Sequence, residues 1–288
     1  MLLFIGISSF LGKNFQKFYP GQYMGAFYPE IAGNRPDNLI IERLDIREKK
    51  DVDGLFKKYS FDSVVLAAAL IYSKNKDGFR KVNVDGVKNV VEAMKESGVK
   101  KIIYISTAVL EAGMELWGEY GRTKKMAEDL IKNSGLEYVI LRPAEIYGEY
   151  EKEGIGKLIK WIKKYSFFPL IGGGRNMLSP VRAEDVCSIV IKCLETESHD
   201  NKTFLLCGGE KISFKNLALK IGQHFNKKIC FIPIPAFLFS LIMNCWPFID
   251  KDQMKRAVNT RAFDSSSAEA EFGFKFKEID FSYLDKPL

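Results

Sequence analysis

Short apolar runs, separated by longer amphipathic stretches, recur through the first half of the chain. The runs are rich in β-branched and aromatic residues without strict polar alternation, so they predict strands buried on both faces. They lie at Leu2–Ile5, Tyr23–Tyr28, Leu39–Leu44, Ser63–Ala68, Lys101–Ser106 and Tyr138–Leu141. The stretches between them place apolar residues at helical spacing, which predicts helices at Leu11–Phe18, Val52–Tyr59, Val82–Ser97 and Lys124–Asn133. This alternation is typical of an α/β fold with a doubly wound parallel sheet, the Rossmann arrangement.

The pattern is less regular after residue 150. Helices are predicted at Gly154–Tyr165, Ala183–Thr196 and Ser213–Phe225, the last capped by Ser213, with a strand at Thr203–Cys207. No internal repeat or low-complexity linker separates the two halves. We therefore expect residues 1–150, joined by some later segments, to form one domain, and residues 151–288 to form mainly a smaller C-terminal α/β lobe packed on it.

One stretch, residues 229–249, carries no charge over 21 residues. Its length alone approaches that of a membrane span, but Pro233, Pro235 and Pro247 interrupt it. The part between the prolines favours a helix that is buried in the core or lines a pocket. The alternative that stays open is a surface that touches lipid or a partner, that is, a peripheral membrane contact. The apolar run at the N-terminus has no basic residue before it and leads directly into Gly6, so it predicts a strand and not a signal peptide.

The composition, with 47% hydrophobic and 27% charged residues among 288, is that of a globular protein. Two histidines, His199 and His224, are too few for a three-His or two-His metal centre, so no metal is expected. The five cysteines form no C-x-x-C pair, which favours reduced thiols and a cytoplasmic location. The net charge of +7 is spread among alternating charges, and no basic run interleaved with aromatics suggests nucleic acid.

The first loop has the composition of a dinucleotide-binding turn. Gly6 and Gly12 enclose Ile7-Ser8-Ser9-Phe10-Leu11, between a predicted strand and a predicted helix. Gly6 permits a tight turn, and Gly12 lets the helix pack closely on the strand. The amides of the loop and the helix N-terminus can then hold a pyrophosphate. Ser9 stands where such loops have a middle glycine, and it adds a side chain at the approach of the cofactor.

A second group of residues follows the fifth predicted strand. Ser106 and Thr107 end that strand at the carboxyl edge, where ligands bind in such sheets. Tyr120 and Lys124 follow with the spacing Tyr-x-x-x-Lys, which puts both side chains on one helical face. The lysine can lower the pKa of the phenol, and the tyrosine can then act as acid or base toward a substrate hydroxyl or carbonyl.

These residues together resemble the short-chain dehydrogenase/reductase superfamily, in particular its extended branch of NAD-dependent epimerases and dehydratases. The matching segments, in the family's order, are Gly6–Gly12, Leu44–Ile46, Leu66–Ala68, Asn83–Asn89, Tyr104–Thr107, Tyr120 with Lys124, Leu141–Gly148 and Pro180–Val186. The resemblance implies that residues 1–150 form a Rossmann core that binds NAD or NADP. It also implies that residues 151–288 are mainly a lobe that binds a small-molecule substrate, and that a homodimer is possible. It implies that Thr107, Tyr120 and Lys124 are catalytic. It also implies that the cofactor is bound by Gly6, Ser8, Ser9, Phe10, Leu11, Gly12, Asp45, Ile46, Ala67, Ala68, Asn83, Ser106, Pro143 and Ile146.

The departures from the resemblance concern the substrate. Ala108 and Val109 stand where dehydratases of this branch carry an Asp-Glu pair that eliminates water. Glu145 replaces an Asn that faces nucleotide phosphates, and Leu178 replaces an Arg. These differences argue against a standard UDP-sugar epimerase and suggest the atypical members, including relatives of an accessory subunit of respiratory complex I. Glu145, Arg175 and Arg182 are the candidate substrate residues.

Three functions stay open. The first is an NAD(P)-dependent oxidoreductase or epimerase that acts on a secondary alcohol or ketone, possibly of a sugar type. The second is a catalytically silent NAD(P)-binding scaffold or sensor that docks a partner or membrane through residues 233–249. The third is an enzyme acting on a sugar carried by a lipid. Cofactor choice is also open, because Glu30 favours NAD whereas Arg35 favours NADP.

Overall fold

A seven-stranded parallel sheet forms the centre of the molecule. The computed structural model describes residues 1–28, 36–73, 75–196, 199–235, 255 and 259–285. The sheet order is β11-β6-β5-β4-β1-β2-β3, and every neighbouring pair is parallel. The strands are β1 (Leu2–Ile5), β2 (Tyr23–Phe27), β3 (Leu39–Arg43), β4 (Ser63–Leu66), β5 (Lys101–Ile105), β6 (Glu137–Pro143) and β11 (Lys202–Leu206). The order reverses between β1 and β4, so the predicted doubly wound fold is confirmed.

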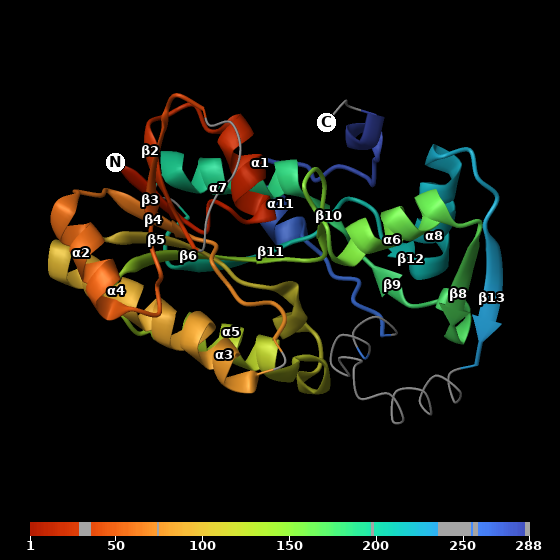
Figure 1. The fold of residues 1–288 in the computed structure, drawn as a ribbon, viewed down its shortest axis with the longest axis horizontal. Coiled ribbons are helices and arrows are strands. Elements are labelled where there is room, and N and C mark those ends of the chain that lie inside the picture. The colour runs from red at the N-terminus through yellow and green to blue at the C-terminus, as the bar shows by residue number, and fades with distance from the viewer. Residues whose placement is uncertain (29–35, 74, 197–198, 236–254, 256–258, 286–288) are drawn as a thin grey trace.

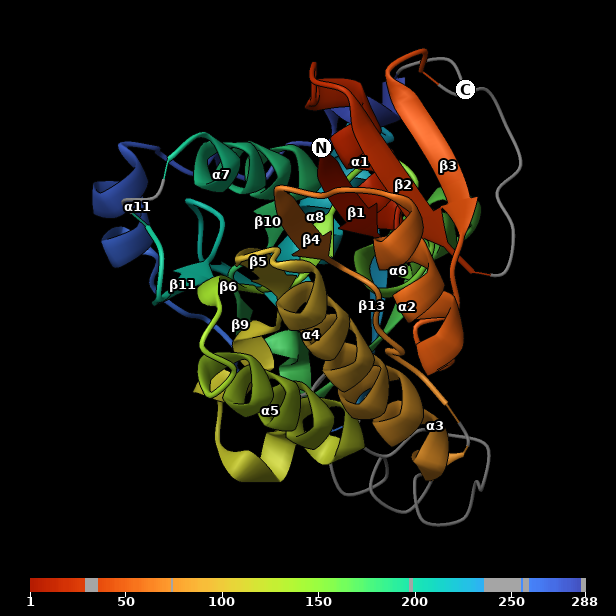
Figure 2. The same cartoon turned by 90° about the vertical axis from the view of Figure 1, so that its left-hand side faces the viewer.

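Helices cover both faces of this sheet, as Figures 1 and 2 show. One face packs on α2 (Lys49–Lys58), α4 (Gly86–Ser97) and α5 (Gly118–Lys132). The other face packs on α1 (Phe10–Phe18), α7 (Ala183–Glu195) and α11 (Ser266–Phe272). The inner strands β1, β2, β4 and β5 are buried on both faces, which explains why their sequences read as apolar runs. Late segments of the chain, α7, β11 and α11, thus pack with the first ones.

Two of the predicted helices begin six residues earlier than the apolar spacing predicts. The helix expected at Val82–Ser97 is preceded by α3 (Lys76–Arg80) and a π-helical turn, Lys81–Asp85, before α4. The helix expected from Lys124 begins at Gly118, so its first turns include Tyr120. Glycines and polar residues dominate these first turns, and they carry no apolar periodicity from which the start could be predicted.

A smaller lobe is built from α6 (Gly154–Lys164), α8 (Phe214–His224) and short strands, and it has its own apolar core. As predicted, Ser213 caps α8: its hydroxyl accepts from the Asn216 amide at 3.2 Å. The short strands pair as β8 (Phe167–Ile171) with β13 (Cys230–Ile234), β9 (Met177–Leu178) with β12 (Ile212–Ser213), and β10 (Val181–Arg182) with β7 (Ile146–Tyr147). The two-residue strands were not predicted, because so short a segment has no period.

The uncharged stretch is described only in its first part. Residues 229–235 include β13, whereas residues 236–249, on which the predicted helix and its membrane or partner contact fall, lie outside the described residues. Ile232 on β13 is 48% exposed and Phe167 near it on β8 is 43% exposed. In the part of the chain that the structure describes, no helix has the length and apolarity needed to cross a bilayer.

Candidate active site

The first loop lies at the carboxyl end of β1, beside the point where the strand order reverses. Gly6 has φ +96°, and a Cβ there would lie 2.7 Å from the Ala68 amide nitrogen. A Cβ on Gly12 would lie 2.5 Å from the Ile7 carbonyl oxygen. Both glycines are therefore required by close backbone approaches, as the sequence predicts. Ser9 is the N-cap of α1, and its hydroxyl accepts from the Gly12 amide at 3.1 Å.

Ser9 has a structural role at the start of α1. The hydroxyl bonds back onto the first turn of its own helix and is thereby held as a cap. The side chain that replaces the middle glycine thus stabilises the helix N-terminus at which a pyrophosphate is bound in such folds. Ser8, Phe10 and Leu11 belong to the same loop and helix start.

Ala67 and Ala68 follow β4, next to the Gly6 turn. Their amides donate to the Ile5 carbonyl at 2.9 and 3.1 Å, which continues the ladder past the strand end. Asn83, in the π-helical turn, is 1% exposed, and its side chain holds the loop that follows β4. Its amide oxygen accepts from Leu70 N at 2.8 Å, and its amide nitrogen donates to Leu70 O at 3.0 Å and to Thr123 Oγ1 at 3.2 Å. Asn83 therefore ties the loop after β4 to α5.

Asp45 and Ile46 follow β3 at the same edge of the sheet. The Asp45 carboxylate accepts from the Arg47 amide at 3.0 Å and from Arg47 Nε at 2.9 Å. These bonds lower the pKa of the Asp45 carboxyl, chiefly through the Arg47 side chain. Ile46 is buried against α4, where its side chain occupies the space that a Cβ on Gly86 would need. Glu30 and Arg35, between which cofactor choice was left open, lie outside the described residues.

Lys124 is fully buried beneath the end of β5. Its ammonium donates to the Ile105 carbonyl at 2.6 Å and lies 4.1 Å from the centre of the Tyr104 ring. Burial lowers the pKa of Lys124 to about 7, although the charge of Glu128 acts in the opposite direction. Tyr120 lies one turn earlier on α5 and is half-buried. Tyr120 and Lys124 thus lie one turn apart on α5, and the ammonium of Lys124 lies at the carboxyl end of β5.

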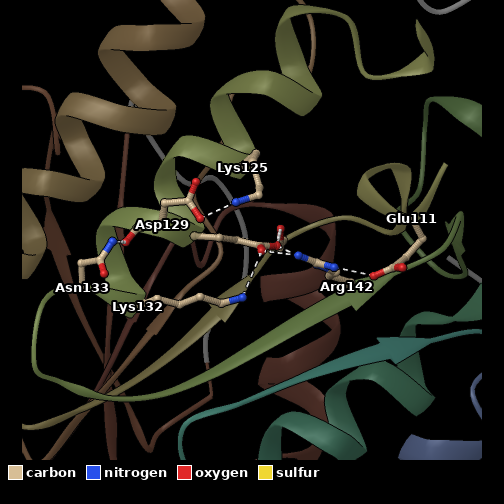
Figure 3. Close-up of polar contacts among 8 residues, drawn as sticks. Glu111, Lys125, Asp129, Lys132, Asn133 and Arg142 are labelled. Atoms are coloured by element: carbon tan, nitrogen blue, oxygen red, sulfur yellow. Dashed lines mark hydrogen bonds and ion pairs between the residues drawn. The ribbon is translucent and has the colours of Figure 1, made fainter. Parts of the chain in front are cut away.

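Behind Lys124 lies a chain of polar contacts that the sequence analysis missed. Ser106, 4% exposed, donates from its hydroxyl to Glu128 Oε1 at 2.5 Å. Glu128 also accepts from Arg142 Nε at 2.9 Å, and Arg142 pairs with Glu111. Figure 3 shows Arg142 reaching toward Glu111 on one side, with Lys132 of α5 on the other. Ser106 is therefore oriented by Glu128. A signal existed, since Glu128 stands four residues after Lys124 on the same helical face.

Thr107 lines a cavity of about 100 Å³ between the sheet edge and the C-terminal segment. Its hydroxyl accepts from Val109 N at 3.3 Å and caps a short 3₁₀ turn. The cavity is also lined by Ala108, Val109, Pro143, Ala144, Glu145, Arg261 and Phe263. Ile146 lies just beyond, at the start of β7. Pro143 and Thr107, taken from separate motifs, thus meet at one cavity.

Glu145 forms an ion pair with Arg261, a residue that sequence reasoning did not single out. Arg175 lines a larger neighbouring cavity of about 710 Å³, together with Glu111 and Glu115. Arg182 is not part of either cavity, because it pairs with Glu184 and lies 3.8 Å from Asp280. Of the three candidate substrate residues, Glu145 lines the same cavity as Thr107, and Arg175 lines the neighbouring one. In the described residues, no cluster of three His, Cys, Asp or Glu side chains is placed to hold a metal ion.

The fold and this edge of the sheet define a Rossmann-type protein with a Tyr–Lys pair. Comparison with known proteins gives the family: the chain matches the NAD dependent epimerase/dehydratase family over residues 3–207, and it belongs to that family. UDP-glucose 4-epimerase of Vibrio cholerae is 25% identical, over 95% of this chain and 90% of that protein. Subunit 9 of the NADH dehydrogenase [ubiquinone] 1 alpha subcomplex of Arabidopsis thaliana is 31% identical, over 67% of this chain and 50% of that protein.

The fold agrees with solved structures. The Bordetella bronchiseptica enzyme WbmG, crystallised in complex with NAD and UDP, superimposes with a TM-score of 0.77 at 20% identity. The match covers 97% of this chain and 90% of that one. The predicted membership of the extended short-chain dehydrogenase/reductase superfamily is thereby confirmed, and NAD is the cofactor that the family's description names.

Proposed function

We propose that the protein is an NAD(P)-dependent oxidoreductase or epimerase that acts at a secondary alcohol or ketone. The observation that carries this proposal is Lys124, which is fully buried at the end of β5, one helical turn from Tyr120. Burying a lysine amine costs free energy, so a buried lysine indicates a functional or structural role. Control of the protonation of the neighbouring Tyr120 phenol, at the carboxyl edge of the sheet where the cofactor would bind, is such a role.

The residues at the first loop fit a dinucleotide. Gly6 and Gly12 keep the turn free of Cβ atoms, and the N-terminus of α1 offers a positive dipole end to a pyrophosphate. Ala67 and Ala68 present small side chains at the same edge. When bound, the nicotinamide accepts or donates a hydride at the substrate carbon.

The roles of the chain's own residues follow from their placement. In the direction of oxidation, Tyr120 takes the proton of the substrate hydroxyl as its carbon loses a hydride, which leaves a ketone. A positive charge on Lys124 favours the phenolate form of Tyr120. Thr107, whose hydroxyl lines the adjacent cavity, orients the substrate oxygen. Reduction runs through the same groups in reverse.

Cofactor binding is the first test. The purified protein should show a rise in melting temperature with NAD(H) or NADP(H), because a ligand that binds only the folded state stabilises it. If none of NAD, NADH, NADP and NADPH binds, the proposal is wrong. The form that binds also settles the choice between NAD and NADP.

Substitution at Tyr120 separates an enzyme from a silent scaffold. With any substrate that is turned over, Tyr120→Phe should reduce kcat by at least about a hundredfold while leaving cofactor affinity within about twofold. Tyr138→Phe is the matched control, because Tyr138 lies near the amino end of β6, away from this edge. Equal loss of activity in both variants would show that the phenol of Tyr120 has no specific role.

A further inference from the structure

We infer that the substrate site excludes a nucleoside diphosphate and takes a substrate whose distal part is neutral, with the Glu145–Arg261 pair as the determinant. This inference rests on the proposed function and refines its substrate class. It starts from the cavity beside Thr107, because Glu145 and Arg261 line the same cavity and would adjoin a substrate whose oxygen lies at Thr107.

Both partners of the pair are fixed by their backbone. The Glu145 carbonyl accepts from the Val181 amide at 2.9 Å, which places it between β6 and β7. The Arg261 amide donates to the Met177 carbonyl at 2.7 Å, and Arg261 bridges to Leu178. Their side chains are only 21% and 12% exposed. The pair is therefore preformed and largely desolvated, unlike a loose ion pair on the surface.

The charges around the site do not suit an added dianion. The charge of Arg261 is neutralised by its ion pair with Glu145, and that of Glu111 by its ion pair with Arg142. Among the described residues that line the two neighbouring cavities, this leaves one carboxylate, Glu115, and one guanidinium group, Arg175, outside these pairs, so no net positive charge remains for a diphosphate. A diphosphate would have to take Arg261 from Glu145 and leave that carboxylate buried without a partner, which proteins tolerate poorly.

The Glu145–Arg261 pair has hydrogen-bonding atoms that a neutral ligand group can satisfy. Glu145 Oε2 is a buried acceptor and Arg261 Nε is a buried donor, and neither has a hydrogen-bond partner among the residues that the structure describes. Buried polar atoms of this kind are costly when left unpaired. Two neighbouring hydroxyl groups of a sugar, or one carboxamide, supply a donor and an acceptor together once the two side chains turn toward the cavity.

The inference is tested by titrating UDP into the cofactor-loaded protein in a calorimeter. The wild-type protein should show no binding up to about 1 mM UDP, whereas Glu145→Gln should bind UDP at least about tenfold more tightly, since it frees the charge of Arg261. Adding Arg261→Gln to Glu145→Gln should remove that gain. Glu115→Gln is the matched control, because it removes a carboxylate from the larger cavity without touching the pair. Its effect should be smaller than that of Glu145→Gln.

Two results would overturn the inference: micromolar binding of UDP by the wild-type protein, or a Glu145→Gln variant that gains no affinity. Thermal melting of each variant, in the presence of cofactor, shows whether it is folded, and Glu145→Asn replaces any variant that is not. The readout is distinct from that of the proposed function. UDP binding needs no turnover, so a failure of the Tyr120→Phe test would leave the UDP result standing. If no cofactor binds, which contradicts the proposed function, the same UDP titration on the cofactor-free protein still tests the inference.

Discussion

Glu128 of α5 and Arg142 of β6 form an ion pair behind the end of β5, where Glu128 also accepts the Ser106 hydroxyl. The Glu128 side chain is 0% exposed and that of Arg142 is 15% exposed. The pair therefore joins a helix of one sheet face to the sheet edge that carries Thr107. It holds the helix that carries Tyr120 against the ends of β5 and β6.

Removal of one partner of this pair should be strongly destabilising. Glu128→Ala leaves the Arg142 guanidinium with Glu111 alone, and we expect a loss of about 3–5 kcal/mol in the free energy of unfolding. Glu128→Leu combined with Arg142→Met should recover most of this loss, because neither charge then remains buried. Urea denaturation measures both values.

The same helix offers a control for that measurement. Asp129→Ala removes an ion pair with Lys125 whose side chains are 49% and 39% exposed, and it should cost less than about 1 kcal/mol. If Glu128→Ala and Asp129→Ala cost the same, the buried pair is not what holds α5 against β6.

Lys124 should make the stability of the cofactor-free protein depend on pH. Its pKa is about 7 in the folded state and about 10.5 when exposed, so between these values the unfolded state binds more protons. Stability then rises with pH across this window. Lys124→Met removes the buried amine, so its advantage in melting temperature over the wild-type protein should be largest at or below pH 7 and should shrink toward pH 10.

Melting curves at pH 6.5 and 9.5 test this. Lys125→Met, at a neighbouring position whose side chain is 39% exposed, is the control and should show no comparable change with pH. An advantage of Lys124→Met that is constant with pH would mean that packing, and not the charge of the amine, causes it.

The sheet was predictable because its strands are buried on both faces. The runs at β1, β4 and β5 are apolar at almost every position, which only a covered parallel sheet requires. The helix starts and the two-residue strands were not predictable in this way. Hydrogen bonds between distant segments define them, and they leave no periodic pattern in the chain.

The candidate site was predictable where one local segment carries it. Gly6 and Gly12 belong to one turn, and Tyr120 and Lys124 to one helix face. Arg261 was not predictable as the partner of Glu145, because the two residues are far apart in the sequence. A backbone bridge to Leu178 brings them together. Glu145 stood out in the sequence because it replaces an Asn that faces nucleotide phosphates, but its ion pair with Arg261 appears only in three dimensions.

Two glycines in different surroundings should respond oppositely to alanine. At Gly12, a Cβ would lie 2.5 Å from Ile7 O and 2.7 Å from Gly6 O, and both are backbone atoms that cannot rotate away. We expect Gly12→Ala to cost about 1–3 kcal/mol and to weaken cofactor binding. Gly54, inside α2, has nothing within 4 Å of such a Cβ, and Gly54→Ala should stabilise the protein by about 0.5–1 kcal/mol.

Urea denaturation and a cofactor titration of each variant measure these effects. Weaker cofactor binding in Gly12→Ala alone supports a role of the first loop in holding the dinucleotide. The same loss in both variants, or none in Gly12→Ala, contradicts it.

Glu151 at the start of the C-terminal lobe should add a second, opposite dependence on pH. Burial raises the pKa of its carboxyl to about 7, although hydrogen bonds from the amides of Gly156 and Glu153 act to lower it. The folded state therefore binds more protons than the unfolded state between about pH 4.5 and pH 7, and stability falls as pH rises through that window.

Glu151→Gln keeps an acceptor for the Gly156 amide without the charge, so it should match the wild-type protein near pH 4.5. By pH 8 it should be more stable by about 1 kcal/mol, once the partial exposure of the side chain is allowed for. Glu153→Gln, whose side chain is 77% exposed, should show no such gain. Melting temperatures of the three proteins at pH 5 and pH 8 decide the matter, and an equal gain at both values would mean that the carboxylate of Glu151 is not buried as its surroundings indicate.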